Sequence, residues 1–93
     1  LIDSGAFSGC NNLMDINITR NVKEIGSNAF KNCESLNSIY IPLNVEVIRP
    51  YAFTGCENII IYCEASSKPS GWDKNWIYLC GEVRWGQRES DVI

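Results

Sequence analysis

The chain repeats a short phrase every 23 residues. Each copy carries an isoleucine, an Ala-Phe pair, a cysteine and then a leucine or isoleucine at fixed intervals. The matching positions are Ile2/Ile25/Ile48, Ala6/Ala29/Ala52, Phe7/Phe30/Phe53, Cys10/Cys33/Cys56 and Leu13/Leu36/Ile59. A period of 20 to 30 residues is typical of a solenoid, in which a repeat buries its apolar side chains only by stacking on its neighbours. The sequence therefore predicts one stack of rungs whose equivalent side chains form columns.

The β-strand of the repeat is clearest in the second unit. Ile39 and Ile41 alternate with Ser38 and Tyr40, so the isoleucines point into the core and the other two point outward. Pro42 ends the strand because it has no amide hydrogen to donate to a ladder. Stacked copies of this unit give parallel strands.

The rest of each repeat predicts a second wall and a tight corner. Residues 45–48 form a short β-prone run, and Asn44 before them favours a turn. Residues 26–33 combine Ser, Asn and an Ala-Phe pair, which favours a short helical or 3-10 corner with Phe30 inside. The predicted fold class is therefore α/β and β-rich, a solenoid with parallel strands and short helical or 3-10 corners.

The repeat stops after residue 63. A turn-rich connector leads into a segment with four large aromatic residues, Trp72, Trp76, Tyr78 and Trp85. A solenoid needs an atypical terminal unit over its last rung, and such side chains each bury about 150–250 Å². We therefore expect repeats over 1–63, a C-terminal cap over 64–86 and a polar tail over 87–93 that is disordered or leads out of the domain. A sugar-stacking platform is the alternative role for Trp72 and Trp76.

Composition excludes several classes of function. The formal net charge is −3 and there is no basic run, which disfavours nucleic acid and anionic membranes as partners. The longest apolar stretch, residues 59–63, is too short to span a bilayer. The chain has no histidine, so Cys–His and Ser–His nucleophile pairs are excluded. We predict no enzyme activity, no catalytic residue and no cofactor.

The five cysteines do not indicate a metal site. Cys10, Cys33 and Cys56 occupy one column about 5 Å apart, where small buried thiols pack as apolar groups. A spacing of 23 residues is not that of a zinc knuckle, and Cys63 with Cys80 supplies two ligands where a structural site needs four. A Cys63–Cys80 disulfide, which would indicate an oxidising compartment, and two free thiols both remain open.

The outward side chains of the strands are the candidate partner-binding residues. Aligned over three rungs, they are Asp15, Asn17, Ser38, Tyr40, Ile60, Tyr62 and Glu64. The alignment makes Tyr40 and Tyr62 neighbours on one surface. Tyrosines are favoured in binding hot spots. They are also good strand residues that stack for stability, so both readings stay open.

The phrase I-G-x-x-A-F-x-x-C-x-x-L-x-x-I-x-I-P, present from Ile25 to Pro42, resembles the BspA-type leucine-rich repeat. Residues 61–72 and 83–86 resemble the cap that closes this family's repeats. The resemblance covers residues 2–86 and implies a right-handed leucine-rich repeat solenoid. Members are typically repeat regions of bacterial cell-surface or secreted proteins, some implicated in adhesion. The resemblance therefore implies that location and a host or cell-surface protein partner, and it supplies no catalytic residue.

Two functions remain open after these observations. The first is a non-catalytic protein-binding or adhesion module that presents the parallel-strand face. The second is a structural cap or spacer of a longer solenoid, with no binding site of its own. The chain begins at Leu1 inside a repeat, so we expect earlier repeats to be missing and the first rung to be uncapped. An uncapped parallel edge favours self-association through that rung.

Overall fold

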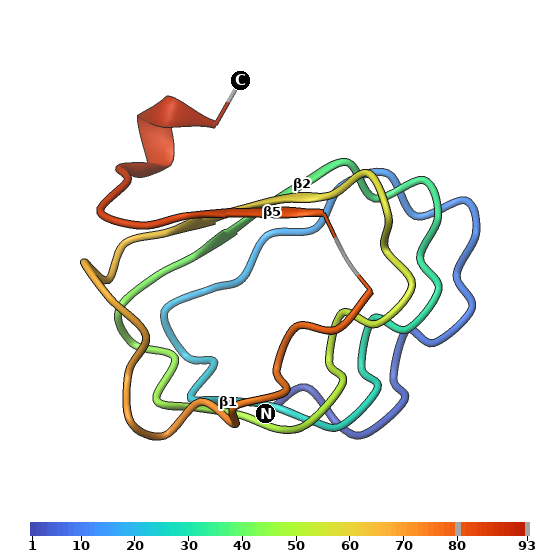
Figure 1. Cartoon of the computed structure of the whole chain (residues 1–93), viewed down its shortest axis with the longest axis horizontal. Helices are drawn as coiled ribbons and strands as arrows, with labels where there is room; N and C mark the ends of the chain where they lie inside the picture. Colours follow the sequence, from blue (N-terminus) through green and yellow to red (C-terminus); the bar gives the residue numbers. More distant parts are fainter. Residues whose placement is uncertain (80, 93) are drawn as a thin grey trace.

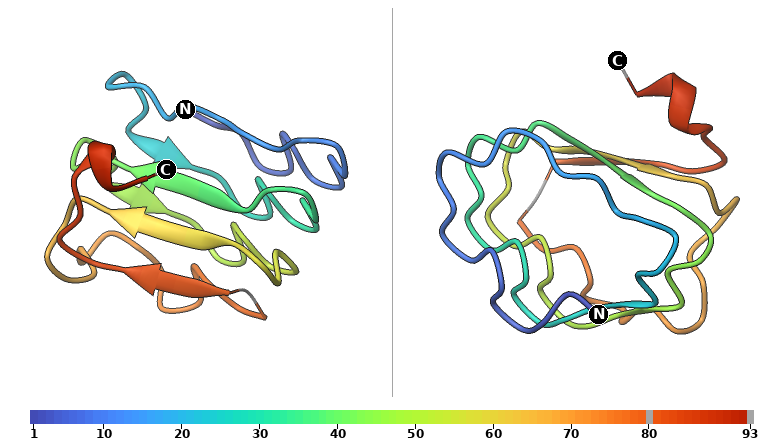
Figure 2. Two further views of the ribbon diagram at one scale, coloured as in Figure 1. Left: turned by 90° about the horizontal axis from the view of Figure 1, so that it is seen from above. Right: turned by 180° about the vertical axis from the view of Figure 1, so that it is seen from behind.

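The computed structural model describes residues 1–79 and 81–92, and its repeats lie side by side as parallel rungs (Figures 1 and 2). Its elements are β1 (Glu24–Ile25), β2 (Ser38–Ile41), β3 (Val47–Ile48), β4 (Ile60–Cys63), β5 (Glu82–Arg84) and the 3-10 helix η1 (Glu89–Asp91). One parallel sheet pairs β1 with β3, and the other has the order β2-β4-β5. The two sheets form opposite walls around the apolar interior (Figure 1). The predicted parallel strands are confirmed.

The inward and outward alternation of the strands is as predicted. Ile39 and Ile41 on β2 are 2% and 0% exposed, and Ile61 and Cys63 on β4 are both fully buried. Side chains of like kind also meet across the ladder, because Ile39 pairs with Ile61. Residues 15–19 of the first unit form no assigned strand, so β5 supplies the third strand of this sheet.

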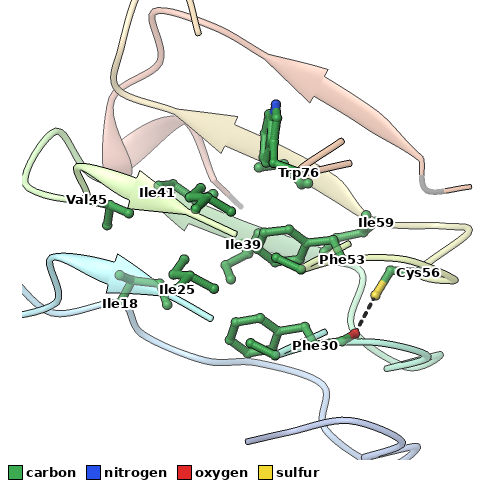
Figure 3. Packing of buried hydrophobic residues seen from close by; sticks show 14 of the residues in the cluster. Ile18, Ile25, Phe30, Ile39, Ile41, Val45, Phe53, Cys56, Ile59 and Trp76 are labelled. Atoms are coloured by element: carbon green, nitrogen blue, oxygen red, sulfur yellow. Dashed lines mark hydrogen bonds between the residues drawn. The ribbon is translucent and has the colours of Figure 1, made fainter. Parts of the chain in front are cut away.

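The phenylalanines form one continuous file through the core (Figure 3). The rings of Phe7 and Phe30 are 5.3 Å apart between centroids, and those of Phe30 and Phe53 are 5.2 Å apart. The stacked rings are nearly coplanar, at interplanar angles of 6° and 3°. The file ends on Trp76, whose ring meets Phe53 edge-on at 6.2 Å. The predicted column is confirmed.

The corners are not helical, so that part of the predicted fold class is wrong. Residues 26–33 form consecutive turns, in which Ala29 N donates to Gly26 O and Cys33 N donates to Phe30 O. The amide of Phe30 donates instead to Ala52 O of the next rung, at 2.8 Å. A helix needs its amides for bonds within the segment, whereas here the stack uses one of them between rungs.

Left-handed backbone explains how these turns reverse the chain. Two corner positions in each rung have φ between 58° and 82°, and the two sets are Gly5/Asn28/Tyr51 and Gly9/Asn32/Gly55. Glycine and asparagine adopt this conformation at least steric cost. The 23-residue repeat is therefore also a repeat of backbone conformation.

Tryptophans cover the last rung. Trp72 and Trp76 are each 2% exposed and lie 4.8 Å apart between ring centroids, and the ring of Trp85 lies about 6 Å from both. The indole Nε1 of Trp72 donates to Val45 O at 3.0 Å, and Trp72 also pairs with Ile48 in a parallel bridge. Buried rings of this kind offer no sugar-stacking platform to solvent, so that alternative is wrong. The boundaries 1–63, 64–86 and 87–93 stay predictions.

Candidate functional site

The outward face of β2, β4 and β5 carries the residues that the sequence singled out. Asp15, Asn17 and Glu64 are exposed, and Ser38, Tyr40 and Ile60 are partly exposed. Tyr40 and Tyr62 are direct neighbours in the β2–β4 register, as predicted. The face therefore brings together side chains from three successive rungs.

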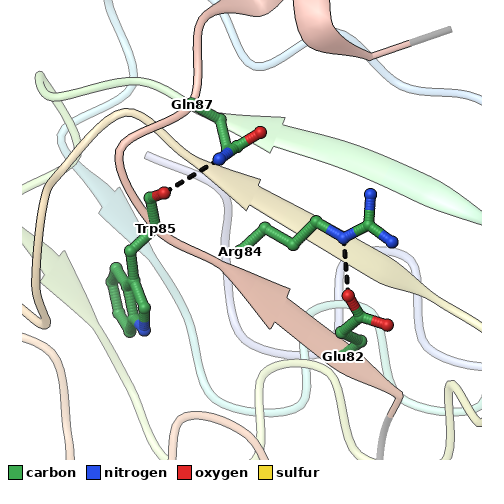
Figure 4. A network of polar contacts seen from close by, with 4 residues as sticks. All are labelled: Glu82, Arg84, Trp85 and Gln87. Carbon is green, nitrogen blue, oxygen red and sulfur yellow. Dashed lines mark hydrogen bonds and ion pairs between the residues drawn. The ribbon is translucent and has the colours of Figure 1, made fainter.

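Tyr62 is less accessible than we expected, with 8% of its surface exposed. The reason is β5, which pairs with β4 and sets Arg84 beside Tyr62. The Arg84 guanidinium lies over the Tyr62 ring at 5.5 Å from its centroid, within the range of a cation–π contact. Glu82 holds Arg84 by an ion pair and raises the pKa of that guanidinium (Figure 4). The strand that covers Tyr62 has no counterpart in the repeat, so periodicity did not reveal it.

The C-terminal segment also reaches this face, which the sequence did not predict. Gln87 N donates to Cys63 O at 2.8 Å at the end of β4. The Tyr40 hydroxyl donates to Gln87 O at 3.2 Å, and the Gln87 side chain donates to Trp85 O (Figure 4). The chain then continues into η1, which lies on the outer side of the sheet (Figures 1 and 2).

Two surface pockets meet at Tyr40. The larger has a volume of about 450 Å³ and is lined by Asn17, Ile18, Thr19, Arg20, Tyr40, Pro42, Glu64, Arg88 and Glu89. The smaller has a volume of about 230 Å³ and is lined by Asp15, Ile16, Asn17, Ser38, Ile39, Tyr40, Glu89 and Val92. Asn17, Tyr40 and Glu89 line both, so the two pockets flank η1.

Carboxylates dominate the electrostatics around Tyr40. Burial raises the pKa of the Tyr40 phenol, and the charges of Glu64 and Glu89 raise it further, while Arg20 acts in the opposite direction. The phenol therefore stays protonated at neutral pH and acts as a hydrogen-bond donor. Such a surface suits polar recognition.

The cysteine column is packed and chemically quiet. Cys33 Sγ donates to Phe7 O and Cys56 Sγ donates to Phe30 O, both at 3.0 Å (Figure 3). Burial raises the pKa of Cys33 to about 11 and that of Cys63 to about 12. Thiols with such pKa values are protonated at neutral pH and are poor nucleophiles.

The remaining chemical possibilities concern metals, disulfides and membranes. Within residues 1–79 and 81–92, no group of three or more acidic or cysteine side chains is placed to hold a metal ion. Cys63 is a free thiol, and Cys80, the other half of the considered disulfide, lies outside the described residues. In the same part of the chain, no helix has the length and apolar character needed to cross a bilayer.

Comparison with known proteins gives one match. A family model described as the BspA type leucine rich repeat region (6 copies) matches residues 1–69. No curated protein and no solved structure matches the chain.

Proposed function

Because the chain belongs to the BspA type leucine-rich repeat family, we propose that it is a non-catalytic protein-binding or adhesion module. Leucine-rich repeats generally mediate protein–protein interaction, and they do so through the extended surface of their stacked units. The observation that carries the proposal is the pair of pockets around Tyr40 on the outward strand face. The partner is a protein, and nucleic acid is not expected.

The proposed contact surface consists of the candidate residues that solvent reaches. Asp15, Asn17 and Ser38 border the smaller pocket, and Tyr40 and Glu64 border the larger one. Ile60 lies at the rim, between Ser38 and Glu82 in the ladder. We assign Tyr62 a supporting role beneath Arg84, because little of its ring is accessible.

The same proposal includes the finer architecture and the location. We propose a right-handed solenoid with repeats over 1–63, a C-terminal cap over 64–86 and a tail over 87–93. Parallel pairing and the stacked side-chain columns support this arrangement. BspA-type repeats are usually found in surface or secreted proteins, so we place the chain at a bacterial cell surface or outside the cell. A host or cell-surface protein is then the expected partner.

Catalysis has little support. The family is typically non-catalytic, and the chain has no histidine to activate a nucleophile. The raised pKa values of Cys33 and Cys63 point the same way, because neither supplies a thiolate at neutral pH. We therefore propose binding as the activity.

A structural cap or spacer is the second candidate. The observation that favours it is the tryptophan cluster, where Trp76 closes the phenylalanine file and Trp72 covers the second wall. A chain with only this role would close a longer solenoid, and its strand face would bind nothing. The first rung would then contact earlier repeats or, in their absence, another copy.

A capture experiment separates the two candidates. The immobilised chain is incubated with host-cell extract and with extracellular matrix proteins, and bound proteins are identified by mass spectrometry. Asp15→Arg changes the exposed strand face, and Glu57→Arg makes the same change of charge on the exposed corner. The binding proposal expects Asp15→Arg to lose the partner and Glu57→Arg to keep it. Equal capture by both variants, or no enrichment by the wild-type chain, would contradict the proposal and favour the spacer.

A further inference from the structure

The segment Gln87–Val92, called the strap below, lies on the face where we propose that a partner binds. The strap leaves β5 at Gly86, whose φ of 66° turns the chain back. Its first residue is fixed, because Gln87 N donates to Cys63 O at 2.8 Å and Tyr40 Oη donates to Gln87 O at 3.2 Å. Figures 1 and 2 show the rest of the strap beyond this point, over the outer side of the sheet.

The strap contributes to both pockets of the face. Arg88 and Glu89 line the larger pocket, and Glu89 and Val92 line the smaller one. Val92 is partly buried although it is close to the end of the chain. The strap therefore occupies the surface that a partner would use.

Beyond Gln87 the strap is held mainly by its own bonds. Arg88 N donates to Asp91 Oδ2 at 2.7 Å, Asp91 N to Arg88 O at 2.8 Å and Val92 N to Glu89 O at 3.1 Å. Within the described part of the chain, no hydrogen bond or ion pair joins residues 88–92 to β2, β4 or residues 15–20. This short turn keeps its internal bonds when it lifts off, so displacing it breaks few polar contacts.

We propose that residues 88–92 are an intramolecular occupant of the strand face, which the partner must displace. This inference rests on the proposed binding function. It also describes the partner, since a segment that replaces the strap is expected to copy its chemistry. That segment is a short acidic peptide with a branched aliphatic residue three positions after a carboxylate, as Val92 follows Glu89. The carboxylate would enter the pocket of Arg20, and the aliphatic group would lie near Ile39.

The test uses the full chain and a blocked synthetic peptide of residues 87–92. Val92→Lys places a charge at the anchored tip of the strap, and Ser90→Lys makes the same charge change at an exposed position that lines neither pocket. The peptide is titrated into each ¹⁵N-labelled chain, and amide shifts of Asn17, Ser38 and Tyr40 are followed by NMR. If the strap covers the face for 90% of the time, its release strengthens peptide binding about tenfold. We expect this gain for Val92→Lys and no gain for Ser90→Lys.

Several results would overturn the strap. Equal peptide binding by the wild-type chain and Val92→Lys would do so, and so would the absence of shifts in both at millimolar peptide. Tyr40→Phe is the second variant, because it keeps the ring and removes the bond to Gln87 O. A smaller gain, about two- to threefold, is expected there if that bond closes the strap, and an unchanged affinity would count against it.

The strap and the binding function fail in different ways. If Asp15→Arg abolishes partner capture while Val92→Lys and wild type bind peptide and partner equally, the strap is wrong and the function stands. If peptide binding follows the expected order but no partner is captured, the strap is right and the proposed function is wrong.

Discussion

The two ends of the stack contain the same repeat residues in different surroundings. At the C-terminal end Phe53 is fully buried between Phe30 and Trp76. At the N-terminal end Phe7 is stacked on one side only and stays partly exposed. Leu1 and Met14 of the first unit are about 70% exposed, at 71% and 70%. The comparison teaches that the repeat sets which residues form a column, and that the neighbouring rungs set how much each one stabilises the fold.

The largest expected effect comes from emptying the middle of the phenylalanine file. Phe30→Ala should lower the free energy of unfolding by about 3–5 kcal/mol, because Phe30 is fully buried and stacked on both faces. Phe7→Ala is the matched control and should lower it by less than half as much. Urea denaturation of both variants measures the difference. Equal losses would mean that the two ends of the file are energetically alike, against the comparison.

The next effect tests the covered end. Trp72→Phe keeps a large ring but removes the indole donor to Val45 O, so a buried carbonyl loses its partner. We expect a loss of about 1–3 kcal/mol in the free energy of unfolding. Trp85→Phe is the control, since Trp85 is only partly buried and should lose less. If both substitutions had the same small effect in thermal and urea unfolding, the indole bond would not be holding the covered end together.

Much of the architecture follows from the 23-residue period. The columns of Phe and Cys, the inward Ile39 and Ile41 and the tryptophan cover were all predicted, because each depends on side-chain pattern and burial alone. The corner between residues 26 and 33 was not, because its conformation depends on φ rather than on hydrophobicity. A signal was present, since Gly5 and Gly9 alternate with Asn28 and Asn32 at the same spacing. Glycine and asparagine in one column indicate left-handed backbone.

The candidate face was predicted less completely than the core. The repeat placed Tyr40 beside Tyr62 correctly, since register follows from the period. It gave no information on β5 or the strap, because residues 82–92 do not belong to the repeat. Arg84 and Gln87, which reduce access to these tyrosines, are therefore visible only in three dimensions.

A third prediction compares one asparagine column at two heights in the stack. Asn44 Nδ2 donates to Thr19 O at 3.1 Å and to Val22 O at 2.8 Å, which ties its turn to the preceding rung. Asn21 has the equivalent position in the first unit, and within the described residues its side chain has no such bond. Asn44→Ala should cost about 1 kcal/mol in urea denaturation, and Asn21→Ala should be nearly neutral. Equal costs would show that asparagine acts through its own turn rather than between rungs.

The smallest effect vanishes at neutral pH and concerns the thiols. Burial raises the pKa of Cys63 from about 9 to about 12 and that of Cys33 from about 9 to about 11. A raised pKa in the fold means that unfolding releases protons more readily once the pH passes the unfolded value. The stability from these buried neutral thiols is thus fully present below pH 9 and is lost as the pH rises towards 11 and 12. Urea midpoints at pH 8 and pH 10 should therefore fall in the wild-type chain.

Alanine variants assign this fall to particular rungs. Cys63→Ala removes the most strongly shifted thiol, so its urea midpoint should fall less than that of the wild-type chain between pH 8 and pH 10. Cys10→Ala, in the partly exposed first rung, should fall as much as wild type. The tyrosines and lysines titrate in the same pH range in all three proteins, so they cancel in the comparison. An identical fall in all three would remove Cys63 as a source of alkaline sensitivity. A smaller fall in Cys10→Ala alone would place the sensitive thiol at the open end of the stack, opposite to where burial puts it.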